Sequence, residues 1–227
     1  MSTDLAAVFA SLQSYHVARP AEPLPAARPG VTWIWAANGV FKRGVDAVRD
    51  ILIQVTPTCP TPGLAQLVPH VRYTTHAGRI PGALLSALLE HARRAGDEGA
   101  IARPIEQQYF VTYRAGLPRP FRLALPAQDA SAVKVQYALT VSGTPLVDLH
   151  SHHGLGAFFS DVDDRDDMGL SISAVVGQIF DRPKIALRAN VYGHRQRLPA
   201  LAVFDCLPDG LCDTYRARGV RHAHADD

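Results

Sequence analysis

The spacing of hydrophobic residues changes near residue 80 of this chain. Before that point, apolar residues occur in short runs that are typical of strands and are separated by turn-forming residues. These runs span residues 31–36, 40–43 and 51–55. The pair Asn38-Gly39 lies between the first two runs, and because this pair is preferred in type I′ turns we expect a hairpin there. Residues 1–75 are therefore predicted to form a small β-containing unit, whose function the sequence does not reveal.

From Pro81 onward, apolar residues recur at the spacing of an α-helix. One side of this helix would carry Leu84, Leu85, Leu88, Leu89 and Ala92. Pro81 suits the first turn and Gly96 suits the C-terminal cap, so the helix is predicted to run between them. A second helix, short and acidic, is expected at residues 161–168.

Strand-like runs make up most of the remaining chain. They span residues 107–113, 121–125, 133–139, 145–150, 172–180, 184–192 and 198–204. This order of helix, strands, helix and strands predicts an α+β domain at residues 76–207, built on one curved mixed sheet flanked by helices. The polar tail at residues 208–227 is expected to be flexible.

Composition excludes several classes of function. The 227-residue chain has 23 basic and 21 acidic side chains, so its charge gives no reason to expect nucleic-acid binding. Its cysteines, Cys59, Cys206 and Cys212, form no C-x-x-C pair, and we predict neither a disulfide framework nor a cysteine zinc site. No apolar run approaches the roughly 20 residues of a membrane span, and no signal-peptide pattern is visible. We therefore expect a cytoplasmic protein that does not bind membranes.

Candidate metal ligands follow the apolar run at residues 145–147. His150 and His152 are two residues apart, and such side chains share one face of a strand. Asp163 completes a set of two imidazoles and one carboxylate, which leaves a fourth position for water as in a catalytic zinc site. Ser160 precedes Asp163 by three residues and is a candidate donor to the oxyanion of a hydrolytic intermediate.

Each of these residues also has a purely structural explanation. Ser160-x-x-Asp163 is the pattern of a helix N-cap, and a lone histidine in a strand is commonly a core or surface residue. The neighbouring acidic residues are predicted to form a solvated face rather than to bind metal. They are Asp161, Asp164, Asp166 and Asp167.

Other residues near the candidate ligands receive supporting or unrelated roles. His153 should be an exposed neighbour, because adjacent strand positions point to opposite faces. Asp148 is a candidate to orient a ligand histidine. Phe158 and Phe159 would form an apolar lip of the site or part of the core. His222 and His224 are expected to belong to a flexible tail rather than to a second metal site.

The spacing H-x-H-x7-S-x-x-D from His150 to Asp163 resembles the motif of the JAB/MPN (JAMM) metalloproteases at every fixed position. The resemblance covers residues 80–205 and implies a cytidine-deaminase-like fold with one zinc ion per chain. It also implies that His150, His152 and Asp163 bind this zinc.

The resemblance further implies a glutamate general base at the start of the strand that follows the first helix. Glu106 matches that position best, and Glu98, in the turn after the helix, is the fallback, whereas Glu90 lies inside the helix. The chain departs from the common family pattern just after Glu106, where residues 107–109 replace the usual small residues and glycine.

Residues 157–164 and 188–194 resemble one prokaryotic branch, the PRTRC system protein A family, whose members carry an extension comparable to residues 1–75. This resemblance implies a bacterial operon that also encodes a ubiquitin-like protein, a ThiF-like activating enzyme and a conjugating-enzyme-like protein. The chain would then cleave after the C-terminal glycine of the ubiquitin-like protein, either to mature its precursor or to release it from conjugates.

Two alternative functions remain open. The sequence Asp148-x-His150-x-His152 also resembles the opening motif of PHP phosphoesterases, which bind several metals, but that motif normally stands near the start of a longer domain with further histidine motifs. A non-catalytic MPN scaffold or binding module would keep the fold without turnover. Such relatives usually lack one or more of the ligands that this chain retains.

Overall fold

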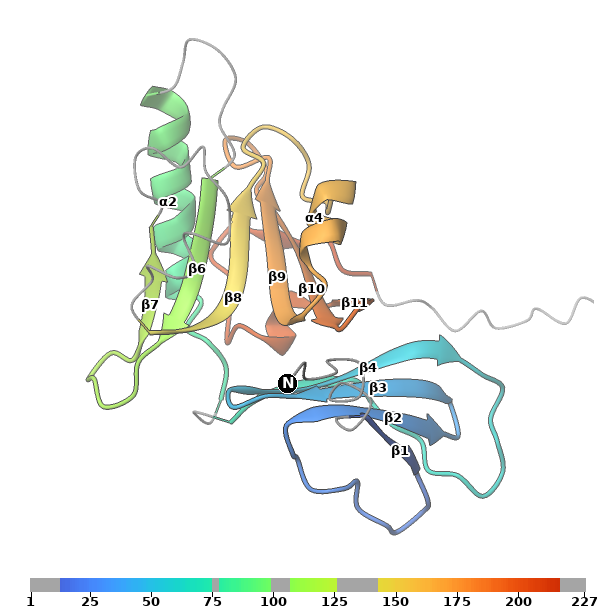
Figure 1. Cartoon of the computed structure of the whole chain (residues 1–227). Helices are drawn as coiled ribbons and strands as arrows, with labels where there is room; N and C mark the ends of the chain where they lie inside the picture. Colours follow the sequence, from blue (N-terminus) through green and yellow to red (C-terminus); the bar gives the residue numbers. More distant parts are fainter. Residues whose placement is uncertain (1–12, 75–77, 99–106, 126–142, 217–227) are drawn as a thin grey trace, which may run out of the picture.

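Two β-sheets form the framework of the protein (Figure 1). The structure is a computed structural model that describes residues 13–74, 78–98, 107–125 and 143–216, with the side chains of residues 95–98 left out. The first sheet has five strands in chain order: β1 (Gln13–Val17), β2 (Gly30–Ala36), β3 (Gly39–Val45), β4 (Arg49–Pro57) and β5 (His70–Tyr73). The β1–β2 pair is parallel and the other pairs are antiparallel.

The second sheet is mixed and carries the histidine motif. Its strand order is β11-β10-β9-β8-β6-β7, and β12 pairs with the first two residues of β10. These strands are β6 (Gln107–Tyr113), β7 (Phe121–Ala124), β8 (Thr144–Ser151), β9 (Leu170–Gly177), β10 (Lys184–Val191), β11 (His194–Leu198) and β12 (Cys212–Asp213). β8 and β9 run parallel because α4 (Asp161–Asp166) crosses between them, whereas β6–β8 and β9–β10 are antiparallel.

The helix α2 (Ala83–Glu98) packs beside β6 and β7 (Figure 1). Leu85, Leu88, Leu89 and Ala92 are buried in the main core, as their helical spacing predicts. The helix begins two residues after Pro81 and continues to Glu98, so the prediction that Gly96 caps it was wrong. No described helix combines the length and apolar character needed to span a membrane.

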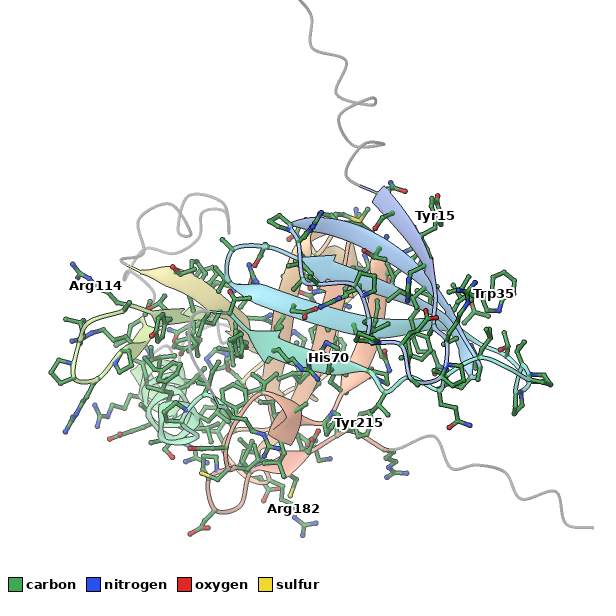
Figure 2. The ribbon with its side chains drawn as sticks, turned by 90° about the horizontal axis from the view of Figure 1, so that it is seen from below. Tyr15, Trp35, His70, Arg114, Arg182 and Tyr215 are labelled. Atoms are coloured by element: carbon green, nitrogen blue, oxygen red, sulfur yellow. The ribbon has the colours of Figure 1, made fainter. Side chains whose placement is uncertain are left out.

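The two sheets share one hydrophobic core. Ile51 and Ile53 of β4 pack into the same buried cluster as Leu187 and Val191 of β10. Gly44 of β3 allows this close approach, since a Cβ there would lie 2.6 Å from Leu170. The predicted domain boundary, after residue 75, lies just after β5. The contacts between β4 and β10 therefore join the two predicted domains in one core. Figure 2 shows the first sheet from below, with Tyr15 and Trp35 exposed toward the end away from α2.

A buried lysine also joins the sheets. Lys42 of β3 is 6% exposed, and its Nζ donates a hydrogen bond to the backbone oxygen of Tyr192 at 2.8 Å. The same Nζ lies 3.2 Å from His194 Nδ1 and 4.9 Å from the ring centroid of Trp33. Burial lowers the pKa of Lys42 because it disfavours the charged form.

The turn between β2 and β3 lies one residue earlier than predicted. Ala36 pairs with Gly39, so the two loop residues are Ala37 and Asn38. A type I′ turn requires positive φ at both of them, and neither has it, while Gly39 has a φ of 151°. The Asn38 side chain instead bonds to both backbone groups of Leu67, at 2.8 and 3.0 Å.

The C-terminal part of the chain also differs from the prediction. Residues 198–204 do not form a strand; β11 ends at Leu198 and a 3-10 helix spans Ala200–Ala202. Pro199 lies between them, and a proline cannot donate to a sheet ladder. The tail is ordered at first, since β12 pairs with β10 and Asp213 Oδ2 accepts a hydrogen bond from the Ala200 amide at 2.6 Å. Residues 217–227 and the predicted strand at 133–139 lie outside the described residues.

The other predicted strands are confirmed, with ends shifted by a few residues. Four strands escaped prediction: β1, β5, β11 and β12. They are short or polar, so their sequences lack the apolar alternation on which the prediction rested. The cysteines Cys59, Cys206 and Cys212 are free and exposed.

We predict that Lys42→Met changes how stability depends on pH. The folded protein has a lowered Lys42 pKa, so as the pH approaches 10.5 the unfolded chain holds this proton more firmly than the folded chain does. The free energy of unfolding of the parent protein should therefore rise with pH relative to that of the variant. Urea unfolding of both proteins at several alkaline pH values measures this difference, and a difference that is independent of pH would contradict the prediction.

Candidate metal centre

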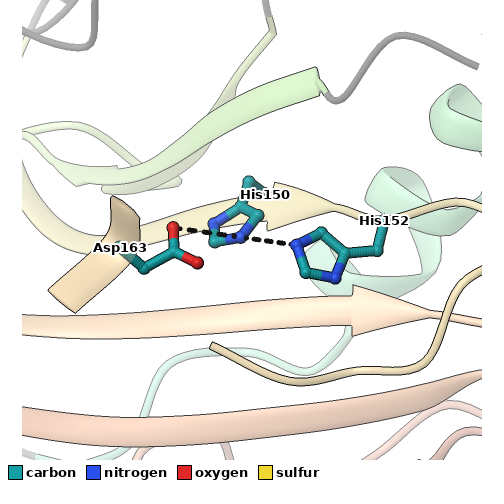
Figure 3. Close-up of side chains that lie close together, drawn as sticks. All are labelled: His150, His152 and Asp163. Atoms are coloured by element: carbon teal, nitrogen blue, oxygen red, sulfur yellow. Dashed lines mark hydrogen bonds and ion pairs between the residues drawn. The ribbon is translucent and has the colours of Figure 1, made fainter. Parts of the chain in front are cut away.

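The ends of two parallel strands place both motif histidines. In the register of β8 and β9, His150 pairs with Val175 and Ser151 with Val176. β8 ends at Ser151, yet the His152 amide still donates to the Val176 oxygen at 2.8 Å. This bond keeps His152 in line with the strand, so the rings of His150 and His152 point to the same side (Figure 3).

Three potential ligands meet at this point. His150 Nε2 lies 3.2 Å from His152 Nε2 and 3.4 Å from Asp163 Oδ1 (Figure 3). One ligand atom from each residue lies within 4.8 Å of the others, and all three residues are buried. The structure thus brings together the three residues that the sequence selected as metal ligands.

The ring of His152 is also held by a contact at its other nitrogen, Nδ1. Its Nδ1 lies 3.1 Å from the carbonyl oxygen of Gly156, and a carbonyl can only accept. Nδ1 therefore carries a proton as the donor of this contact, and Nε2 faces His150. The ring of Phe158 packs edge-on against His152 at a centroid distance of 4.7 Å. Phe158 is half-exposed, which agrees with its predicted place at the lip of the site.

Asp163 is oriented by a helix cap. Ser160 is the N-cap of α4; its hydroxyl and its amide each donate to Asp163 Oδ2 at 2.7 Å, and the Asp163 amide donates to the Ser160 hydroxyl at 3.3 Å. This reciprocal arrangement is a capping box. It occupies Oδ2 and leaves Oδ1 toward His150. The structural and the metal-binding explanations of Ser160-x-x-Asp163 are therefore compatible.

An arginine on β10 holds α4 in place. Arg188 is 4% exposed and donates to Asp167 Oδ2 from Nε at 3.2 Å and from Nη2 at 2.7 Å. It also pairs with Asp164, and its guanidinium stacks 4.0 Å from the ring centroid of Phe159. A helix of six residues is not stable alone, so this anchor fixes the backbone that carries Asp163.

One prediction about the surroundings was wrong. Asp164 and Asp167 do not form a solvated face, because both pair with Arg188; Asp161 and Asp166 are exposed as predicted. Of the two phenylalanines predicted at the lip or in the core, Phe159 packs against Arg188. The sequence did carry a signal for this anchor, since an arginine inside the apolar run of β10 needs a buried anionic partner.

His153 is buried rather than exposed. Its side chain is only 1% exposed, its φ is 48°, and among the described residues its Nδ1 has no hydrogen-bond partner. Burial and the adjacent His152 both lower the pKa of His153. The prediction failed because β8 ends at Ser151, so strand alternation does not reach His153.

The remaining candidates lie beside the cluster or outside the described residues. Asp148 accepts a hydrogen bond from the side chain of Gln108, which is the register partner of His150. The predicted role of Asp148, to orient a ligand histidine, is not tested by this contact and stays a prediction. Four further candidates fall outside the described residues: Glu106, the side chain of Glu98, His222 and His224.

Comparison with known proteins agrees with this geometry. Residues 81–190 match the sequence model of a family described as prokaryotic homologs of the JAB domain. The matched part runs from the start of α2 to β10 and includes His150, His152 and Asp163, whereas the first sheet lies outside it. No curated protein matches the chain.

We predict that Arg188→Lys weakens metal binding through α4. A lysine keeps the positive charge, but it cannot hydrogen-bond to both Asp164 and Asp167 while it stacks on Phe159. Loss of such a supporting contact typically reduces metal affinity 10- to 100-fold, so we expect a loss of about 10-fold in zinc affinity, measured by competition with a chromogenic chelator. Arg182→Lys, in the exposed turn before β10, is the control and should bind zinc like the parent. Unchanged affinity in Arg188→Lys would show that α4 does not depend on this anchor.

Proposed function

Residues 81–190 belong to the family of prokaryotic JAB-domain homologues, and on this premise we propose that the chain is a zinc-dependent peptidase or isopeptidase. The observation that carries the proposal is the convergence of His150, His152 and Asp163 in one buried cluster. The JAB-like arrangement of a mixed sheet with few helices agrees with it. The finer assignments, a cytidine-deaminase-like fold and a cytoplasmic location, are part of the same proposal.

The donor atoms fit a zinc ion. Zn–N and Zn–O bonds of about 2.0 Å in a tetrahedron place neighbouring ligand atoms about 3.3 Å apart. The pairs His150–His152 and His150–Asp163 are separated by 3.2 and 3.4 Å. Three protein ligands leave a fourth position, as in catalytic sites. A zinc ion held there would lower the pKa of its bound water toward about 7 and supply a nucleophile at neutral pH.

The protein must also move a proton and stabilise negative charge. We assign the general base to Glu106, which would take a proton from the attacking water and pass it to the leaving amine. Glu106 directly precedes β6 in the sequence, and β6 is the sheet neighbour of the motif strand β8. Glu98 is the fallback. Ser160 is the proposed oxyanion donor, for which its hydroxyl must exchange the bond to Asp163 Oδ2 for one to the substrate.

For the substrate we propose the C-terminal tail of a bacterial ubiquitin-like protein, cleaved after its last glycine. This follows from the resemblance of residues 157–164 and 188–194 to the PRTRC branch. The tail would bind in extended form beside a sheet edge. ThiF-like activating and conjugating-enzyme-like proteins are the proposed operon partners.

The cluster favours this chemistry over the phosphoesterase alternative. A phosphoesterase of that class binds several metals, and its D-x-H-x-H motif is followed by further histidine motifs. Within the described part of the chain, the cluster with metal-binding spacing contains His150, His152 and Asp163 but not Asp148. A non-catalytic scaffold would retain this cluster as well, so a turnover assay must separate it from the enzyme.

We predict that the protein cleaves a fusion of the ubiquitin-like protein, and that a chelator abolishes the cleavage. Gel analysis with and without chelator, followed by zinc readdition, measures this dependence. Cleavage that persists after zinc removal would refute the metal mechanism. Zinc binding without any cleavage of fusion or conjugate would favour the scaffold.

Two substitutions separate metal binding from proton transfer. His152→Ala should lose both zinc and activity, since it removes a ligand. Glu106→Gln should keep zinc but lose turnover by about 10²-fold or more, which is the usual contribution of a general base. Zinc content by atomic absorption and kcat in the cleavage assay measure the two effects. Glu90→Gln, on the exposed side of α2, is the control, and a loss of turnover in Glu98→Gln instead would transfer the role to Glu98.

A further inference from the structure

Gly177, the last residue of β9, lies directly against the loop that follows the motif histidines. A Cβ at this position would lie 2.4 Å from the oxygen of Leu155, 2.5 Å from the carbonyl carbon of Gly156 and 2.6 Å from the amide nitrogen of Ala157. All three are backbone atoms, so no side-chain rotation can relieve the overlap. Gly177 does not have a positive φ, and the need for glycine here is therefore one of space rather than of backbone conformation.

The loop is fastened to the same strand end by hydrogen bonds. The Gln178 amide donates to the Leu155 oxygen at 2.7 Å, and the Ile179 amide donates to the His153 oxygen at 3.0 Å. His153 and Gln178 both adopt positive φ, at 48° and 52°. Non-glycine residues rarely adopt this conformation, and it persists only where surrounding contacts enforce it. The loop after His152 and the turn after Gly177 therefore form one tightly fitted unit.

This fit determines what His152 contacts. The Gly156 carbonyl that accepts from His152 Nδ1 at 3.1 Å belongs to the peptide group that packs on Gly177. Phe158, whose ring lies against His152, follows two residues later. A side chain at position 177 would push this peptide group outward and remove the acceptor from His152. Nδ1 would then no longer be fixed as the protonated nitrogen, and Nε2 would no longer be held toward His150 and Asp163.

We propose that Gly177 is a positioning residue of the metal centre: its missing side chain admits the loop whose Gly156 carbonyl orients His152 for metal binding. The inference rests on the proposed function, because it concerns the same site. Hydrogen bonds to the second nitrogen of a ligand histidine commonly change metal affinity 10- to 100-fold when removed. Gly177→Ala should therefore bind zinc about 10- to 100-fold more weakly.

Gly154→Ala is the matched control, because it places the same methyl group in the same loop, where no atom lies within 4 Å. Zinc affinity by chelator competition should stay within about 2-fold of the parent in Gly154→Ala and fall in Gly177→Ala. The ¹⁵N chemical shifts of the His152 ring in the metal-free proteins report the tautomer directly. The Nδ1-protonated form should dominate in the parent and in Gly154→Ala but not in Gly177→Ala. A purely structural role of Gly177 would lower stability without changing this tautomer.

If Gly177→Ala retains both the parent affinity and the Nδ1-protonated ring, the inference is wrong. Should Gly177→Ala fail to fold, Leu155→Pro tests the same loop from its exposed side, since it removes the Leu155 amide that bonds to the His152 oxygen at 2.9 Å. That variant should show the same loss of zinc affinity, and parent-like affinity would again overturn the inference. Zinc binding without cleavage would refute the proposed function alone, and the tautomer measurement would still decide the role of Gly177.

Discussion

The parallel pairing of β8 with β9 is the interaction on which the rest of the site depends. It sets His150 beside Val175 and continues into the bond from the His152 amide to the Val176 oxygen, so both rings leave one strand on one side. The same pairing brings the end of β9, at Gly177, against the loop after His152. On its other edge β9 pairs with β10, which carries the arginine that anchors α4. Three adjacent strands thus hold all three candidate ligands, although the ligands come from a strand, a loop and a helix.

The buried cluster combines donor atoms that suit a metal ion with burial. The Nε2 atoms of His150 and His152 lie 3.2 Å apart, and His150 Nε2 lies 3.4 Å from Asp163 Oδ1, in a site where all three residues are about 5% exposed or less. Buried groups of this kind pair with one another or coordinate a metal. The supporting bonds act on the atoms that point away from the centre: Gly156 on His152 Nδ1 and Ser160 on Asp163 Oδ2. These bonds orient the two side chains so that His152 Nε2 and Asp163 Oδ1 point toward His150.

The sequence was sufficient to select the candidate ligands but not to predict the contacts that hold them in place. His150, His152 and Asp163 follow from short-range spacing, because strand alternation and a helix cap are local rules. Alternation failed at His153, one residue past the pairing that enforces it. The partners of Arg188 lie 21 and 24 residues away and required the tertiary fold. The need for glycine at position 177 was equally hidden, since it arises from backbone atoms of another segment rather than from a turn conformation. The paired strands β1, β5 and β12 are defined by their neighbours and carry little pattern of their own.

The first sheet lies outside the part of the chain that matches the family, yet it is packed into the same core. Ile51 and Ile53 bury their side chains against β10 and its neighbours, and Lys42 binds the Tyr192 oxygen just after β10 ends. On the C-terminal side, β11 and β12 flank β10 as well, and Ile80 forms a bridge with Phe204. β10 is therefore supported from both parts of the chain that lie outside the match. β10 also carries Arg188, which anchors α4, the helix that contains Asp163. The first sheet and the C-terminal strands therefore support the strand on which this anchor depends. The matched region contains the candidate ligands, and the flanking segments complete the core that keeps them in place.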